Sequence, residues 1–173
     1  MKIIHFYTIP RRLIMKKEAN IQKVPILNMI VTCRKDGRDN GLVVGFGGNA
    51  SFDPQMIAVG IVPTRFSYDM VKDTGVFVVN FPAKGYEEEY KVFGFESGRD
   101  VDKFEKCDIK FTDGEVVDAP VLTDCPVNFE CTVVDSIKPG SHEMFFGKIE
   151  KVHCDEEYLD DDGNIMWDKI DLL

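Results

Sequence analysis

The sequence lacks the patterns that identify membrane, secreted and zinc-binding proteins. No apolar run approaches the roughly 20 residues of a membrane-spanning helix, and in residues 1–14 the arginines follow the apolar residues, the reverse of a signal peptide. The five cysteines contain no Cys-x-x-Cys pair, so neither a disulfide framework nor a zinc site is indicated. We therefore expect a cytoplasmic protein with free thiols and no membrane contact.

Positive charge is also scarce in this chain. It has 21 lysines and arginines against 30 aspartates and glutamates, and a formal net charge of −9. Such a charge repels nucleic acids and anionic membranes, so we expect no nucleic-acid partner. An anionic cofactor would have to be held by locally placed arginines and backbone donors.

Three further motifs of catalytic or nucleotide-binding proteins are absent. No Gly-x-Gly-x-x-Gly follows a predicted strand, and the compressed glycine run at residues 45–48 precedes no helix. No histidines, cysteines and carboxylates have metal-ligand spacing, and no serine or cysteine lies in a nucleophile motif. The acidic residues 155–162 lack the spacing of a calcium loop, so we interpret them as a solvated turn.

The pattern that is present indicates a mainly β protein. The 173 residues suffice for a single domain, 1–173, with a substantial core. Apolar runs bounded by turn residues predict strands, and the Asn40-Gly41 turn signal predicts an antiparallel hairpin between the first two. The six predicted strands are residues 26–33, 42–46, 56–62, 76–81, 127–133 and 144–154.

Three helices are predicted around these strands. Residues 65–73 form the first, with Thr64 as N-cap and Gly75 at its end. Residues 86–95 and 101–107 form the others. Many short strands with inserted helices favour a six-stranded antiparallel barrel over a parallel sheet. Residues 1–24 are expected to form an arm or a strand, and residues 156–173 a tail.

A glycine turn followed by Asn-Ala-Ser is the first candidate site. Glycines allow the backbone to approach a flat ring closely, and their amides can donate hydrogen bonds to its acceptors. A polar connection between two strands explains the same residues equally well. The segment consists of Gly47, Gly48, Asn49, Ala50 and Ser51.

A second candidate site lies at the start of the first predicted helix. Arg65, Ser67 and Tyr68 stand where free amides and the helix dipole favour an anion such as a phosphate. An exposed helix start with a solvated arginine is the alternative. His142 precedes a strand in a Gly-Ser-His turn and either faces a cleft or points into water. These parts suit a planar polar ligand that carries a phosphate.

Taken in order, several segments resemble the flavin reductase-like family, and its flavoredoxin-type branch in particular. The resemblance covers about residues 24–155, and the ordered set is more specific than any one motif. Among its segments are Asn49-Ala50-Ser51-Phe52-Asp53-Pro54 and Ser97-Gly98-Arg99-Asp100-Val101-Asp102-Lys103-Phe104. The others are residues 24–33, 63–68, 74–80, 125–131 and 141–147.

The resemblance implies an FMN-binding split barrel that acts as a homodimer, with the flavin near the subunit interface. It implies an oxidoreductase that accepts hydride from NADH or NADPH and passes electrons to a flavin, metal centre or small protein. Matching positions put Asn49, Ala50 and Ser51 by the ring and ribityl chain, and His142 near the ring. They put Arg65, Ser67 and Tyr68 near the phosphate, with Asn80 and Lys84 as further candidates.

Three departures from the family pattern stand out. Ser141 replaces the aspartate that usually precedes this histidine, so carboxylate support for the ring is lost. Phe93 stands where several relatives carry a cysteine, so a thiol has no role there. Many relatives also continue past the position of Leu173 with an aromatic-rich segment, whose contacts are expected to be missing.

Two other functions fit the same residues. The protein could be a flavin-binding storage or sensing module without turnover, or a structural barrel without a ligand. Oxidation of NAD(P)H by FMN-loaded protein separates the enzyme from the module. The colour of the purified protein separates both from the ligand-free barrel.

Overall fold

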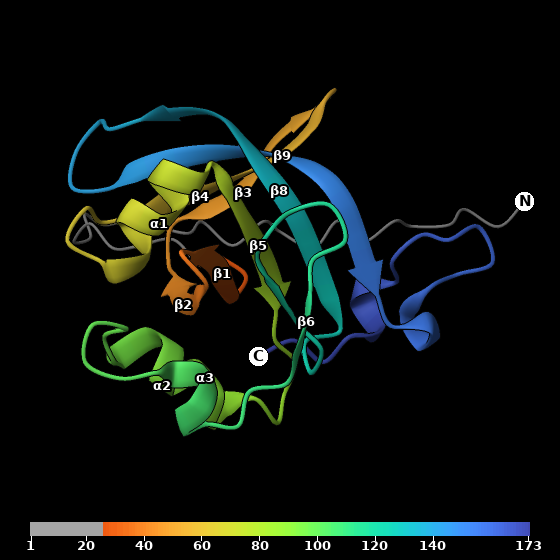
Figure 1. Ribbon diagram of the computed structural model, residues 1–173. Coiled ribbons are helices and arrows are strands. Elements are labelled where there is room, and N and C mark those ends of the chain that lie inside the picture. The colour runs from red at the N-terminus through yellow and green to blue at the C-terminus, as the bar shows by residue number, and fades with distance from the viewer. Residues whose placement is uncertain (1–25) are drawn as a thin grey trace, which may run out of the picture.

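The computed structural model describes residues 26–173, and its centre is an antiparallel sheet in the strand order β2-β1-β5-β8-β9-β4-β3 (Figure 1). The edge strands β2 and β3 are joined by only two residues, Gly45 and Phe46, so the edges must come together and the sheet curls. The strands are β1 (Met29–Lys35), β2 (Arg38–Val44), β3 (Gly47–Phe52), β4 (Gln55–Ile61), β5 (Val76–Phe81), β8 (Val127–Ile137) and β9 (Glu143–Cys154). The mainly β split-barrel fold is confirmed.

Helices and a small second sheet cover the outside of this barrel. Figure 1 shows α1 on one side of the barrel and α2 with α3 below it. The helices are α1 (Phe66–Thr74), α2 (Glu87–Phe95) and α3 (Lys103–Lys106), with short 3-10 turns η1 (Glu156–Tyr158) and η2 (Trp167–Lys169). The second sheet pairs β6 (Phe111–Asp113) with β7 (Pro120–Leu122).

The core has a main part inside the barrel and a second part beneath α2 and α3. Val31 and Phe77 are fully buried in the first part, whereas Ile30 and Phe93 belong to the second. Successive residues of β1 therefore face different apolar clusters. This explains why the strand is a continuous apolar run rather than an alternating one.

The predicted first hairpin forms, but its turn lies elsewhere. Asp36 and Gly37 have φ values of 52° and 73°, the two positive φ angles that a tight type I′ hairpin requires. Asn40 and Gly41 lie within β2 instead, where Gly41 pairs with Thr32. A Cβ on Gly41 would lie 2.6 Å from the Phe93 ring, so this glycine permits close packing and not a turn.

The six predicted strands are all present, but the strand count was too low. The glycine and Asn-Ala-Ser segment, predicted as a connection, forms β3 at the edge of the main sheet. A Cβ on Gly47 would lie 2.5 Å from the Ala58 carbonyl oxygen, so glycine is needed for this pairing. The pair β6–β7 was not predicted either, because each strand has only three residues.

The three predicted helices are present: α1 is shifted by one residue, α2 and α3 are shorter than predicted, and the predicted N-cap of α1 is wrong. Gly75 ends α1 in the left-handed conformation at φ 70°, and its amide donates to the Val71 carbonyl. Arg65, not Thr64, occupies the N-cap position, and no side chain caps this end. The amides at the start of α1 are therefore not consumed by a capping side chain.

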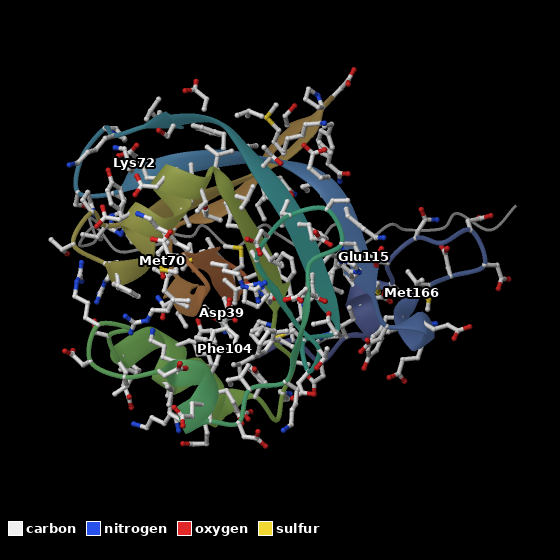
Figure 2. All side chains as sticks on the ribbon, viewed as in Figure 1. Asp39, Met70, Lys72, Phe104, Glu115 and Met166 are labelled. Carbon is white, nitrogen blue, oxygen red and sulfur yellow. The ribbon has the colours of Figure 1, made fainter. Side chains whose placement is uncertain are left out.

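A buried carboxylate holds the loop before β7 against the barrel. Glu130 on β8 is fully buried and accepts hydrogen bonds from the amides of Glu115 (Figure 2), Val116 and Val117 at 2.8–2.9 Å. Burial raises its pKa, but the bonds from His153 at 2.6 Å and from these amides prevail and lower it. From the sequence alone, Glu130 could be recognised only as a polar residue on one face of the predicted strand 127–133.

The C-terminal segment is an integral part of the fold. The Leu173 amide donates to the Pro82 carbonyl at 3.0 Å, and the Trp167 ring lies 5.3 Å from that of Phe81. The predicted arm at residues 1–24 lies outside the described residues. Within residues 26–173, no helix has the length and apolar character needed to cross a bilayer.

Candidate functional site

A small hollow with a cationic lining opens at the start of α1. We call it the cationic hollow; Asn40, Arg65, Ser67, Arg99 and Lys103 are among its lining residues. Its volume is about 90 Å³, which leaves room for a group of phosphate size.

Arg65 is an exposed charge of this hollow. Within residues 26–173 its guanidinium makes no hydrogen bond or ion pair, whereas Arg34 is paired with Asp39 (Figure 2) at 2.6 Å. Glu96 also lines the hollow, but its carboxylate pairs with Lys106 at 2.6 Å. A free guanidinium offers five N–H donors, so the hollow is suited to an anion.

The neutral side of the hollow is fixed by a buried amide–hydroxyl pair. Asn40 on β2 donates from Nδ2 to the Ser67 hydroxyl oxygen at 2.6 Å, and both residues are buried. Ser67 lies in the first turn of α1, where the free amides of the helix also point. The strand therefore fixes the hydroxyl beside the helix start.

Lys103 is the buried charge of the hollow. Its Nζ donates to the carbonyls of Gly41 at 2.8 Å and Phe93 at 3.0 Å. Its pKa is lowered to about 8, chiefly by burial; the Glu96 charge acts in the opposite direction, and the Arg65 charge acts in the same direction as burial. A bound anion would stabilise the protonated form of this lysine.

A histidine and an aromatic ring lie beside Gly60, near the end of β4. The His142 and Phe46 ring centroids are 4.2 Å apart, and Ser141 Oγ lies 2.9 Å from His142 Nδ1. The Gly60 amide donates to the Phe46 carbonyl, and the Arg65 amide to the Val62 carbonyl. The ring pair and the cationic hollow therefore adjoin the two ends of the same short segment, residues 60–65. An open hollow of about 290 Å³ adjoins the ring pair.

Tyr68 joins α1 to the start of β9. Its hydroxyl donates to Glu143 Oε2 at 2.5 Å, and Ser136 and Lys72 (Figure 2) donate to the same carboxylate at 2.7 and 3.3 Å. The Tyr68 bond, followed by the Ser136 and Lys72 bonds, lowers the Glu143 pKa. This network holds the residue next to His142 in place, so Tyr68 fixes the position of the histidine turn.

The predicted glycine segment lines a different hollow. Gly47, Gly48 and Asn49 border an apolar groove of about 460 Å³, together with Phe81 and Trp167. Gly48 has φ 151°, and a Cβ there would meet no atom within 4 Å. Ala50 and Ser51 follow toward the exposed end of the β3–β4 hairpin. A single chain therefore does not bring this segment and Arg65 into one hollow.

Two other predicted residues are committed to contacts within the protein. Asn80 is fully buried; its Nδ2 donates to the Ile30 carbonyl and Thr32 Oγ1, and its Oδ1 accepts from the Leu122 amide and Asn128 Nδ2. These bonds occupy the four positions that an amide side chain offers. Lys84 is exposed and paired with Asp171 at 2.8 Å.

Sequence reasoning missed part of the cationic hollow. Asn40 was interpreted as a turn residue, and Arg99 and Lys103 were noted only as members of a matching segment. All three reach the hollow from parts of the chain far from Arg65. The one available signal was the resemblance of residues 97–104 to the family, which gives no spatial position.

Comparison with known proteins agrees with this architecture. Residues 21–169 match the family model described as flavin reductase like domain. Among solved structures, the flavoredoxin of Methanosarcina acetivorans is 27% identical, with a TM-score of 0.82 over 92% of this chain and 84% of that chain. The flavoredoxin of Desulfovibrio vulgaris (Miyazaki F) is 28% identical, with a TM-score of 0.80 over 87% and 82%.

Curated relatives are longer than this chain. The FMN reductase (NADH) RutF of Acinetobacter baylyi is 28% identical over 74% of this chain and 66% of its own length. The chain covers 53%, 66% and 56% of three other matching relatives, or about half to two thirds of their length. Because the family model covers most of residues 1–173, this protein belongs to the flavin reductase-like family.

Proposed function

We propose that this protein binds FMN and acts as an NAD(P)H-dependent oxidoreductase that passes electrons to a flavin, metal or protein acceptor. The observation that carries the proposal is the unpaired Arg65 guanidinium in a phosphate-sized hollow at a helix start. In a chain of net charge −9, such a local cationic hollow is a specific feature. The likeness to flavoredoxins and to an enzyme named FMN reductase supports the same assignment.

Each part of the hollow has a separate role in this proposal. Arg65 and the protonated Lys103 supply charge to the FMN phosphate, and Ser67 with the first amides of α1 supplies hydrogen bonds. The ring pair Phe46–His142, at the Gly60 end of residues 60–65, would border the flavin ring. When bound, FMN supplies the redox chemistry; the protein orients it and excludes water.

The predicted contacts from the Asn-Ala-Ser segment require a second subunit. In one chain this segment borders the apolar groove rather than the cationic hollow. The adjoining Phe52, on an edge strand, is 89% exposed. Exposed edge strands with large apolar side chains are commonly covered by a partner. We therefore include a homodimer in the proposal, in which β3 of one subunit approaches the flavin of the other.

Two measurements on the purified protein test this function. Titration of ligand-free protein with FMN should quench the flavin fluorescence and saturate at one flavin per chain. Anaerobic NADH or NADPH should then bleach the flavin absorbance of the loaded protein, and an added acceptor should restore it. No binding of FMN would contradict the proposal. Binding without bleaching by either nicotinamide would favour the storage or sensing module instead.

A further inference from the structure

A second hollow lies directly beside the cationic hollow. It has a volume of about 430 Å³ and shares Phe66 and Arg99 with its neighbour. We call it the Phe66 hollow; its other lining residues are Lys35, Asp36, Arg38, Asp69 and Met70. The two hollows are therefore adjacent spaces that share one aromatic ring, and the proposed function assigns the larger one no part in holding FMN.

Two guanidiniums flank the Phe66 ring. The guanidinium carbons of Arg38 and Arg99 lie 4.6 and 5.6 Å from the ring centroid. Arg38 donates to the Gly98 carbonyl, and Arg99 donates to the Thr64 carbonyl at 2.8 Å. Neither forms an ion pair with a carboxylate in residues 26–173. Backbone carbonyls and an aromatic face hold both arginines in place, so most of their donors remain free for a ligand.

Besides the two arginines, this hollow is lined by one lysine and two aspartates. Lys35 is neutralised by its ion pair with Asp73. Asp36 and Asp69 have no ion-pair partner in the part of the chain that the structure describes. A bare anion would be attracted by the arginines but repelled by the two aspartates. A ligand with a phosphate at one end and hydroxyl donors at the other would satisfy both groups.

An adenosine phosphate has this distribution of groups. Arginines bind phosphates through charge-assisted hydrogen bonds, and a carboxylate commonly accepts from ribose hydroxyls in nucleotide sites. The planar guanidinium of Arg38, which lies over the Phe66 ring, offers a surface for a base. Arg99 lines both hollows, so a ligand could extend from one to the other along this arginine.

We propose that the Phe66 hollow binds the ADP moiety of a dinucleotide. This inference rests on the proposed function, because the flavin site would hold either the flavin half of the same FAD or the FMN that accepts hydride from the nicotinamide donor. Two ligands carry that moiety: FAD, in place of FMN, and the nicotinamide donor.

The first test compares FMN with FAD on ligand-free protein, by quenching of flavin fluorescence. If FAD is the molecule whose ADP moiety binds here, FAD should bind at least about tenfold more tightly than FMN, because each charge-assisted bond contributes about 1.5–3 kcal/mol. Arg38→Ala should remove that gain and leave the Kd of FMN within about twofold. Arg38 lines only the Phe66 hollow, so the FMN value is an internal control.

The second test titrates ADP, as a probe, into ligand-free and FMN-loaded protein by calorimetry. If NADH is the source, ADP should bind to both forms, NADH should displace it, and Arg38→Ala should weaken it at least about tenfold. Asp36→Asn is the conservative second variant, because asparagine is accepted at the positive φ of this turn. It should weaken the same ligand about fivefold, and Lys169→Ala should change nothing.

The two proposals can fail separately. If FMN binds but neither FAD nor ADP binding depends on Arg38, the ADP site is overturned and the flavin site stands. If ADP binds in an Arg38-dependent way to a protein that refuses FMN, the ADP site stands and the proposed function falls. Circular dichroism of each variant confirms that the fold is unchanged.

Discussion

The cationic hollow and the barrel wall around Asn80 contain similar polar side chains, but they differ in how many donors are already paired. The Asn80 side chain makes five hydrogen bonds within the protein, and Arg65 makes none in residues 26–173. A paired, buried group contributes to the free energy of unfolding, whereas an unpaired, exposed one is available to a ligand. The two regions should therefore respond oppositely to mutation.

The largest expected effect is on stability at Asn80. Asn80→Ala removes all of these buried hydrogen bonds and leaves the Leu122 amide without its acceptor. The free energy of unfolding should fall by about 3 kcal/mol, because an orphaned buried donor costs about 1–3 kcal/mol and the lost volume adds to it. Urea denaturation followed by circular dichroism measures the change.

The matched control for this variant is Asn49→Ala. Asn49 is exposed on the edge strand β3 and makes no side-chain hydrogen bond within residues 26–173. Its substitution should alter the free energy of unfolding by less than about 0.5 kcal/mol. Equal decreases in the free energy of unfolding for the two variants would contradict the distinction between paired and unpaired groups.

A smaller effect is expected from pH, through Lys103. Burial lowers its pKa to about 8 in the free protein, so it loses its proton as the pH rises through 8. An anion in the hollow favours the protonated form, so above pH 8 the binding of FMN takes up a proton. The Kd of FMN should therefore rise above pH 8, by at most about tenfold per pH unit.

At lower pH the affinity for FMN should change because the FMN phosphate itself takes up a proton. The second ionisation of a phosphate ester has a pKa near about 6, so the FMN phosphate is a dianion above that value. Affinity is thus expected to be greatest between about pH 7 and 8. Fluorescence titrations from pH 6 to 9.5 measure it, and a flat profile above pH 8 would exclude Lys103 from the phosphate site.

Most of the fold could be predicted from the sequence because its strands have strong local patterns. Apolar runs bounded by turn residues located six strands, and the glycine at position 75 marked the end of α1. β3 was missed because its pairing depends on the close approach of Gly47 to Ala58, which no local pattern records. The turn at Asp36–Gly37 was missed in favour of Asn40–Gly41, whose glycine instead accommodates Phe93.

The candidate site was only half predictable. Arg65 and Ser67 are neighbours in sequence at a helix start, a position with a known preference for anions, so they could be found. Asn40 and Arg99 reach the same place from other elements, and only the fold brings them there. Asn80 shows the converse error. An asparagine side chain suits a polar ligand, but partners on other elements already occupy the donors and the acceptor of Asn80.

The FMN affinity of Arg65→Ala, compared with that of Lys169→Ala, tests the central claim most directly. Each variant removes one exposed positive charge, but only Arg65 lines the cationic hollow. Arg65→Ala should raise the Kd of FMN about 10- to 100-fold, the loss of one charge-assisted interaction of about 1.5–3 kcal/mol, with an unchanged free energy of unfolding. Lys169→Ala should leave both values unchanged. An equal Kd for the two variants would contradict the assignment of the phosphate site.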